Sequence, residues 1–289
     1  MSHAFPLPPW WVALAAALAT VAALLIPHWA GTGEPPGEVA TEAPAAPRAI
    51  FHGDLVLTTP GEVIDGLDIR GFVRVEAPNV TISNSVIRGR ATEGDAILLY
   101  AGTGRSPGLR VIDTEFAPSH HTHRTHGVYG ADFTLTRLDI HHVVDGVHIF
   151  GDNVTIEHSH LHSHLHFESD PSHDGGPSHD DGIQVQQGRN IRIIGNVLSG
   201  AHNAAIQITQ DRGPVAHVQI RDNTLSGGGC SINVAEKGAG PIAGLVITGN
   251  EFGESRHACP MLIPPTTQAE LADNRADGHD TVRVDRRAQ

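Results

Sequence analysis

Short apolar segments recur along the chain in one pattern, with two apolar positions one residue apart and a third five residues later. Eight segments match, the last being the least apolar, and their starts lie 21 to 37 residues apart: "VTISNSVI" (80–87), "LRVIDTEF" (109–116), "FTLTRLDI" (133–140), "VTIEHSHL" (154–161), "IRIIGNVL" (191–198), "VQIRDNTL" (218–225), "LVITGNEF" (245–252) and "AELADNRA" (269–276). Alternating apolar positions predict strands. Repeats of this length predict a stacked architecture, in which each unit buries its apolar edge against its neighbours.

Asparagine occupies the sixth position of the pattern in the last four repeats, at Asn196, Asn223, Asn250 and Asn274. We expect these amides to form a ladder at a turn, each bonding the next repeat. Another asparagine opens "NVTI" twice, at Asn79 and Asn153. Both are formal N-x-T sequons, but the simpler interpretation is a turn residue ahead of a strand.

A second strand recurs between these matches, in "AILLY" (96–100), "GVYGA" (127–131), "GVHIF" (146–150), "GIQVQ" (182–186), "AIQIT" (205–209), "SINVA" (231–235) and "PMLIP" (260–264). Apolar pairs such as Val147/Ile149 and Ile183/Val185 predict the inward positions, and the residue between each pair points outward. The predicted outward residues are, in order, Leu98, Tyr129, His148, Gln184, Gln207, Asn233 and Leu262. A polar strip flanked by apolar ends suits an extended glycan. The alternative is an ordinary solvated sheet face.

Two short strands per repeat with no helical pattern predict an all-β fold, a single-stranded parallel β-helix over residues 50–289. Leucine-rich repeats would need an L-x-x-L-x-L frame, which the chain lacks. The stretches "TPGEVIDGLDIRGFVRVEAPNVTISNSVIRG" (59–89) and "HDDGIQVQQGRNIRIIGN" (179–196) resemble bacterial secreted members of the right-handed parallel β-helix superfamily. That pectin lyase-like superfamily includes pectate lyases, polygalacturonases and phage tailspikes. The resemblance covers roughly 55–276 and specifies fold better than chemistry.

The N-terminal segment is predicted to be separate from this domain. Residues 10–26, "WWVALAAALATVAALLI", are uncharged and mostly apolar, which favours a signal peptide or a single transmembrane anchor over residues 1–30. The Pro/Ala/Glu-rich residues 31–49 are predicted to be an extended linker. We therefore expect an extracellular protein, or a membrane-anchored one facing outward, with a monomeric β-helix domain.

The net charge and the cysteine content narrow the class of protein further. A formal net charge of −13 argues against nucleic acid as a partner, because phosphates need a basic face. The two cysteines, Cys230 and Cys259, open "CSINV" and "CPMLI" at one repeat position in successive repeats. Neighbouring parallel strands lie about 4.8 Å apart, within disulfide range. We predict a disulfide suited to an oxidising compartment, with two unpaired buried thiols as the alternative.

Histidines collect on connections that approach the outward strip. The stretch "HSHLHSHLHFESDPSHDGGPSHDDG" (158–182) fills the longest gap between repeats, with His162 to Asp180 as an insertion. Another His-rich connection, "PSHHTHRTHG" (118–127), and His141/His142 precede earlier strands. Three hypotheses compete: a metal site, since imidazole binds zinc or copper; a catalytic rim for polysaccharide cleavage; and solvated polar loops. No defined metal-ligand spacing such as H-E-x-x-H occurs, so the metal identity stays unknown.

Candidate catalytic residues are those where a connection meets a strand: His148, His179, Asp180, Asp181 and His202. The adjacent Asp180/Asp181 pair is similar to the acidic pair of polygalacturonases. The G-H-G and R-I-K motifs of that family are absent, which argues against hydrolysis by that mechanism. Aspartate-glycine also recurs in "IDGL", "VDGV" and "DDGI", so Asp181 has a turn-forming role as its alternative.

For a lyase, the resemblance implies calcium to neutralise the substrate carboxylate and an Arg or Lys base. Arg212 and Lys237 follow successive strands of the strip and are candidates for binding an anionic sugar, together with Tyr129, Gln184, Gln207 and Asn233. Stacked calcium carboxylates are not evident, so a divalent metal, calcium or zinc, stays an expectation. We predict an exported polysaccharide-cleaving enzyme, with a lyase ahead of a hydrolase. The alternative is a noncatalytic glycan-binding or envelope surface module.

Overall fold

The computed structural model describes residues 48–287 apart from 103, 277–278 and 281. The predicted signal or anchor and nearly all of the predicted linker lie outside these residues. Within the described range the chain is almost entirely β-strand, and its helices are two single 3₁₀ turns, η1 (Pro171–His173) and η2 (Lys237–Ala239). None of the described helices is long and apolar enough to cross a membrane.

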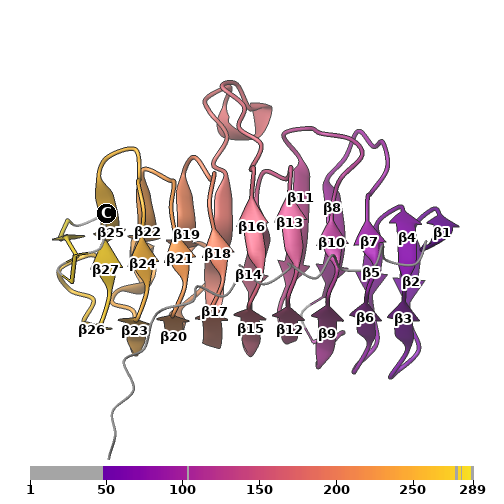
Figure 1. Ribbon diagram of the computed structural model, residues 1–289, viewed down its shortest axis with the longest axis horizontal. Coiled ribbons are helices and arrows are strands. Elements are labelled where there is room, and N and C mark those ends of the chain that lie inside the picture. The colour runs from indigo at the N-terminus through magenta and orange to yellow at the C-terminus, as the bar shows by residue number, and fades with distance from the viewer. Residues whose placement is uncertain (1–47, 103, 277–278, 281, 288–289) are drawn as a thin grey trace, which may run out of the picture. The chain divides into compact units, whose positions relative to one another are not determined.

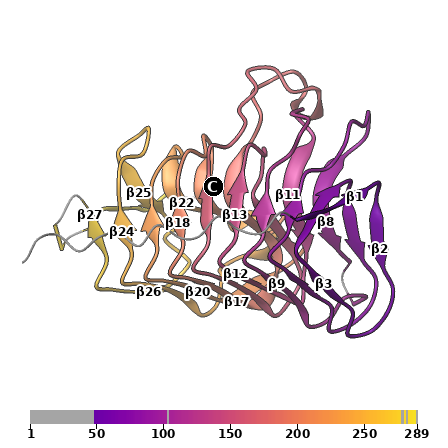
Figure 2. The ribbon, with the colours of Figure 1, turned by 45° about the vertical axis from the view of Figure 1, so that its right-hand side comes forward.

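The strands form three parallel faces, which the chain visits in the same order in each coil (Figures 1 and 2). Sheet A contains β1 (Ala49–His52), β4 (Leu67–Arg70), β7 (Val86–Ile87), β10 (Glu115–Phe116), β13 (Asp139–His141), β16 (His160–His162), β18 (Val197–Leu198), β21 (Thr224–Leu225), β24 (Glu251–Phe252) and β27 (Arg275–Ala276). All its pairings are parallel, and they join strands of successive coils.

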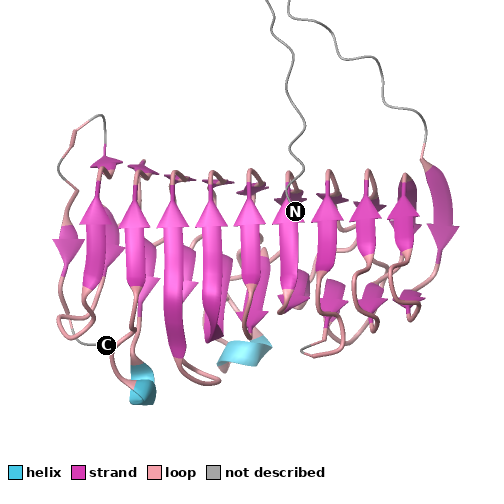
Figure 3. Ribbon diagram, turned by 90° about the horizontal axis from the view of Figure 1, so that it is seen from below, coloured by secondary structure: helices cyan, strands magenta, loops and turns pink. Residues whose placement is uncertain are grey.

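Sheets B and C make up the rest of each coil. Sheet B contains β2 (Leu55–Leu57), β5 (Val73–Val75), β8 (Ala96–Ala101), β11 (Thr125–Gly130), β14 (Val147–Phe150), the first half of β17 (Asp181–Ile194), β19 (Ala204–Ile208), β22 (Cys230–Val234), β25 (Cys259–Leu262) and β28 (Val284–Asp285). Sheet C contains β3 (Val63–Asp65), β6 (Thr81–Ser83), β9 (Leu109–Ile112), β12 (Phe133–Thr136), β15 (Val154–Glu157), the second half of β17, β20 (Val215–Arg221), β23 (Leu245–Thr248) and β26 (Ala269–Ala272). The row of large arrows in the middle of the view, one from each successive coil, points the same way (Figure 3). The predicted parallel β-helix is confirmed.

Each coil has three strands, so the prediction of two was wrong. The eight-residue pattern is not one strand: it is a strand of sheet C, a two-residue corner and a strand of sheet A. Its fifth residue has a positive φ in every repeat, at Asn84, Asp113, Arg137, His158, Gly195, Asp222, Gly249 and Asp273. Most of these are residue types that tolerate the left-handed conformation. Asn79 and Asn153 also have a φ of 58°, which confirms their interpretation as turn residues.

The asparagine ladder is confirmed at that corner. Asn196, Asn223 and Asn250 are each 1% exposed. The backbone N–H of Asn223 donates to Oδ1 of Asn250 at 3.0 Å, and its side-chain amide donates to the same oxygen at 2.9 Å. That amide also donates to the carbonyl of Ile193 at 2.9 Å. The ladder therefore satisfies buried polar groups at each corner of the stack.

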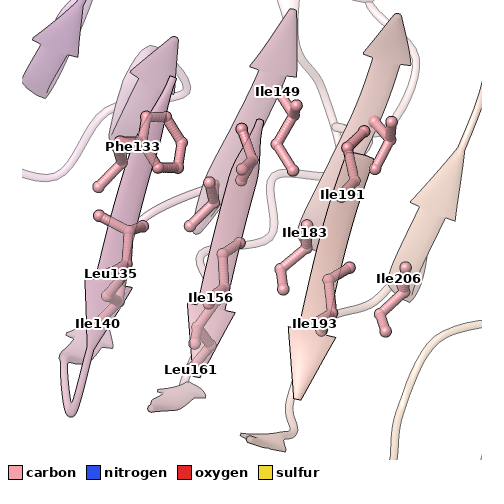
Figure 4. Close-up of a cluster of buried hydrophobic side chains, with 14 of the residues drawn as sticks. Phe133, Leu135, Ile140, Ile149, Ile156, Leu161, Ile183, Ile191, Ile193 and Ile206 are labelled. Atoms are coloured by element: carbon pink, nitrogen blue, oxygen red, sulfur yellow. The ribbon is translucent and has the colours of Figure 1, made fainter. Parts of the chain in front are cut away.

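The core is a continuous column of aliphatic side chains inside the coils. Leu135, Ile156 and Ile193 are fully buried there and lie on the neighbouring strands β12, β15 and β17 (Figure 4). The predicted inward pairs, Val147/Ile149 and Ile183/Val185 among them, are all 0% exposed. Since each coil buries its apolar residues against the next, the outward side chains are stacked at one-strand intervals.

Register places the outward residues of sheet B in one column. Tyr129, His148 and Gln184 are direct partners on successive coils, followed by Gln207, Asn233 and Leu262. The prediction of Leu98 was wrong, because Tyr100 pairs with Tyr129 and Leu98 is 0% exposed. Leu98 and Leu99 are both 0% exposed, which breaks the simple alternation.

The predicted disulfide is present between Cys230 and Cys259. These residues are direct partners on β22 and β25, with Cα atoms 4.6 Å apart. The bond joins successive coils near the C-terminal end of the domain.

Candidate functional site

One edge of the domain, where sheet A passes into sheet B, carries the histidine-rich connections. The connections 117–124, 142–146, 163–180 and 199–203 lie side by side along this edge, and the long insertion 163–180 rises above the others (Figure 1). The predicted location of the histidine-rich stretch 158–182, beside the outward column of sheet B, agrees with this arrangement.

A cluster of two histidines and one aspartate lies at the start of the sheet B strands. Nδ1 of His126 lies 3.0 Å and Nε2 of His148 lies 3.1 Å from Oδ2 of Asp145. The two distances are short, but neither contact is aligned as a hydrogen bond. Burial raises the pKa of Asp145, but His148 and then His126 outweigh it and hold that pKa well below its usual range. Asp145 is therefore a buried anion that orients two imidazoles.

Glycine fixes the backbone beside this cluster. A Cβ on Gly127 would lie 2.2 Å from the carbonyl oxygen of Gly146, and one on Gly146 would lie 2.5 Å from that of Gly182. Only glycine allows coils to approach this closely. The residues before these glycines stand at one register position on successive coils, so Asp145 and Asp181 are neighbours.

Tyr129 packs on both imidazoles. Its ring stacks on that of His148 with centroids 4.3 Å apart, and the ring of His126 lies 5.0 Å away. Burial and the nearby Asp145 raise the pKa of Tyr129 well above its ordinary value. The phenol therefore keeps its proton at neutral pH and acts as a donor.

Asp181 is buried beside Asp145 rather than open to a substrate. It is 0% exposed, its backbone N–H donates to Oδ1 of Asp145, and its own Oδ1 accepts from Asn203 at 2.8 Å. Burial and the Asp145 carboxylate raise the pKa of Asp181 well above its usual range. Two carboxylates this close do not both ionise readily.

Asp180 belongs to a second group formed with the insertion. Its Oδ1 lies 2.7 Å from Nδ1 of His166, and its Oδ2 accepts the backbone N–H of His202. The rings of His166 and His202 have centroids 3.7 Å apart. Burial, followed by His166, lowers the pKa of His202. The structure thus brings Asp180 together with His202, while His148 contacts Asp145 instead.

His179 belongs to a third group of side chains, with His173 and Asp170. Its ring lies 4.3 Å from that of His173, which contacts Asp170 at 2.8 Å. Burial lowers the pKa of His179, with His173 contributing further. The five predicted catalytic residues are therefore distributed over adjacent groups on the same edge.

The predicted binding residues follow the sheet B column. The guanidinium of Arg212 lies 4.7 Å from the centre of the Phe150 ring, and its Nε donates to Gln186 at 2.7 Å. Phe150 in turn contacts Tyr129 edge-on at 5.4 Å, so Arg212 borders the His–Asp cluster. Gln186 donates to Gln184 at 3.1 Å.

Toward the C-terminal coils, the predicted binding residues are bonded to other side chains of the protein. Asn233 donates to Gln207 at 2.8 Å, and Gln207 is only 5% exposed. Lys237 lies 3.6 Å from Asp211 with about half of its side chain exposed, which is an ordinary surface ion pair.

Hollows continue the column toward the N-terminal coils. A hollow of about 450 Å³ is lined by Phe72, Arg74 and Tyr100 among others, and a second of about 270 Å³ by Arg74, Tyr100 and Arg105. Arg74 also lies over the Tyr100 ring at 5.1 Å. Aromatic and guanidinium groups thus adjoin the cluster on the side of the preceding coils.

Sequence reasoning missed His126, Asp145 and His166. A signal for the first two was present, because "THGV", "VDGV" and "DDGI" align the residue before each glycine. His166 stands in the insertion, where no repeat fixes its partners.

Calcium fits neither of the metal-ligand groups found among the described residues. These groups are His166 with Asp180 and His202, and an exposed group of Asp139, His160 and His162 on sheet A. Each offers two imidazole nitrogens, whereas calcium takes six to eight oxygen ligands.

The fold class is confirmed by comparison with known families. The profile of the family described as "Right handed beta helix region" matches residues 71–275, and the chain therefore belongs to that family. The predicted resemblance is thus confirmed.

Two solved structures are similar to this chain, each with 12% sequence identity. One is the mannuronan C-5 epimerase AlgE6 A-module of Azotobacter vinelandii, with a TM-score of 0.44, covering 75% of this chain and 63% of that one. The other is the Dettilon tailspike protein, with a TM-score of 0.32, covering 82% and 61%. The chain thus spans less than two thirds of either structure. No curated protein matches the chain.

Proposed function

We propose that this protein is an exported polysaccharide lyase, acting on a polymer that contains uronate sugars. The single observation that carries the proposal is the contact of Asp145 with His126 and His148, beneath Tyr129. Lyases need a base for the proton alpha to the carboxylate, an acid for the departing oxygen and a cation for the carboxylate.

Each part has a candidate here. Asp145 faces one nitrogen of each imidazole, which leaves Nε2 of His126 and Nδ1 of His148 for a substrate proton. Tyr129 keeps its own proton, because its pKa is raised by burial, and donates it to the departing glycosidic oxygen. Arg212, held beside Phe150, neutralises the uronate carboxylate. The carbon–oxygen bond breaks as the carbon–carbon double bond forms, so no water is consumed.

Buried carboxylates argue against the hydrolase alternative. Asp145, Asp180 and Asp181 are 4%, 0% and 0% exposed, and each is engaged by neighbouring groups. Glycoside hydrolysis needs two carboxyl groups placed on either side of a substrate bond. These three carboxylates have no such access.

The test is to incubate the purified full chain with a panel of uronate and neutral polysaccharides, with and without a chelator. The proposal predicts ultraviolet absorbance from unsaturated ends on a uronate polymer. New reducing ends without that absorbance would make the protein a hydrolase. Binding without either product would make it a noncatalytic glycan-binding module.

A further inference from the structure

Three side chains from separate segments converge where the insertion meets the coil. His166 comes from the insertion, Asp180 from its last residue before β17, and His202 from the next connection along the edge. One ligand atom from each lies within 4.8 Å of the others. None of the three belongs to the cluster that the lyase proposal uses.

Burial makes this group unlike a solvated loop. Asp180 is 0% exposed, and Nε2 of His166 is buried without a hydrogen-bond partner among the described residues. The rings of His166 and His202 approach to 3.7 Å between centroids. A buried imidazole nitrogen without a partner is costly, whereas a cation between two imidazoles and a carboxylate would use such lone pairs.

We propose that His166, Asp180 and His202 bind one Zn²⁺ ion. Two nitrogen donors and one carboxylate oxygen suit zinc, which takes four ligands of this kind. Three protein ligands leave one position for water or for Glu168, whose carboxylate lies 3.8 Å from Nε2 of His166 and is highly exposed. Zinc at this group ties the insertion 163–180 to two coils.

The site therefore determines the position of the insertion beside the sheet B column. Within the insertion, Phe167 and Ser178 bond each other through N–H of Phe167 and Oγ of Ser178 at 2.9 Å. The insertion is thus a closed loop of its own, and His166 and Asp180 are the two ends by which zinc holds it. The ion acts on loop position and takes no part in the proton transfers proposed above.

The test titrates the metal-free full chain with Zn²⁺. Calorimetry measures Zn²⁺ binding, and protease cleavage measures how well the insertion is protected. The wild-type chain is expected to bind Zn²⁺ and to become more resistant to cleavage within 163–180. H166Q and H202Q are expected to weaken Zn²⁺ binding at this site at least about tenfold and to remove the protection. Calcium at the same concentration is expected to give no protection.

The matched control is H162Q, which disrupts the exposed group of Asp139, His160 and His162. It is expected to leave the protection unchanged and to remove only binding at the sheet A surface. The proposal is overturned if the wild type binds no Zn²⁺, or if H162Q abolishes the protection while H166Q and H202Q keep it. Circular dichroism of each variant distinguishes lost binding from lost folding, and D180N supplies an isosteric variant should either histidine variant unfold.

Discussion

Burial and neighbouring side chains determine the charge of the carboxyl groups in and beside the His–Asp cluster. Asp145 carries a charge in a buried position because two imidazoles face it, and Asp181 beside it is pushed toward its neutral form. His148 was predictable from the repeat, since it stands between inward Val147 and Ile149. Asp145 and His126 were not recognised, because each stands just before the glycine that opens the strand segments "GVHIF" and "GVYGA".

Asp145 makes the fold pH-dependent. Its folded-state pKa lies below that of the unfolded chain, so the ionised group stabilises the fold above about pH 4 and loses this effect as pH falls. Asp145→Asn is therefore expected to lower stability by about 3 kcal/mol at pH 6. Denaturant melts from pH 6 to pH 3 should show the gap between variant and wild type narrowing. A gap that stays constant over this range would mean that Asp145 is not the buried anion described.

Tyr129 offers a direct test of the proposed acid. Tyr129→Phe keeps the ring stacked on His148 and removes only the hydroxyl. We expect kcat on the responsive uronate polymer to fall about 100-fold, while the melting temperature changes little. An unchanged kcat would remove Tyr129 from the chemistry.

At the scale of elements, the repeat made most of the fold predictable. The eight-residue pattern located a strand of sheet C and a strand of sheet A in each coil, and the asparagines located the corner between them. The number of strands per coil was missed, because a two-residue corner leaves the apolar spacing nearly continuous. Leu98 was misplaced because it stands at the position of Gly127, where both strands have two successive buried residues, and "AILLY" has no glycine to mark that position.

The asparagine ladder should be sensitive to one substitution. Asn223→Leu removes the acceptor of the Asn196 backbone N–H, one of the two acceptors of the Asn196 amide and a donor to the carbonyl of Ile193, all in a buried corner. We expect a loss of about 3 kcal/mol or more in the free energy of unfolding, measured by urea denaturation. Substitution of exposed Val197, on the adjacent strand, to Thr serves as the control and should change stability little. An equal effect of both variants would show that the ladder contributes nothing particular.

The disulfide should stabilise the C-terminal coils. It closes a separation of 29 residues, for which restricting the unfolded chain contributes about 3 to 4 kcal/mol. The double variant Cys230→Ala/Cys259→Ala is therefore expected to unfold at lower denaturant concentration than the oxidised wild type. Equal midpoints for the two proteins, with the bond verified by mass spectrometry, would contradict this expectation.

At the scale of the whole molecule, stacking makes residues that are distant in sequence into neighbours. The column from Arg74 and Tyr100 through Tyr129 and His148 to Gln184 is one line of outward groups on successive coils. Sequence periodicity predicted most of that line, because the core dictates which residues face outward. It did not predict how the insertion 163–180 folds back, since His166 pairs with Asp180 through loop geometry alone.

The proposed function depends on whether this line of side chains catalyses cleavage of a uronate polymer. The most direct measurement is the rate of unsaturated end formation on a uronate polymer by the wild type and by His126→Gln/His148→Gln. The proposed mechanism predicts absorbance growing with time for the wild type and a rate at least about 100-fold lower for the double variant, with both proteins folded. Absence of unsaturated ends on every uronate polymer, or equal rates for the two proteins, would contradict it.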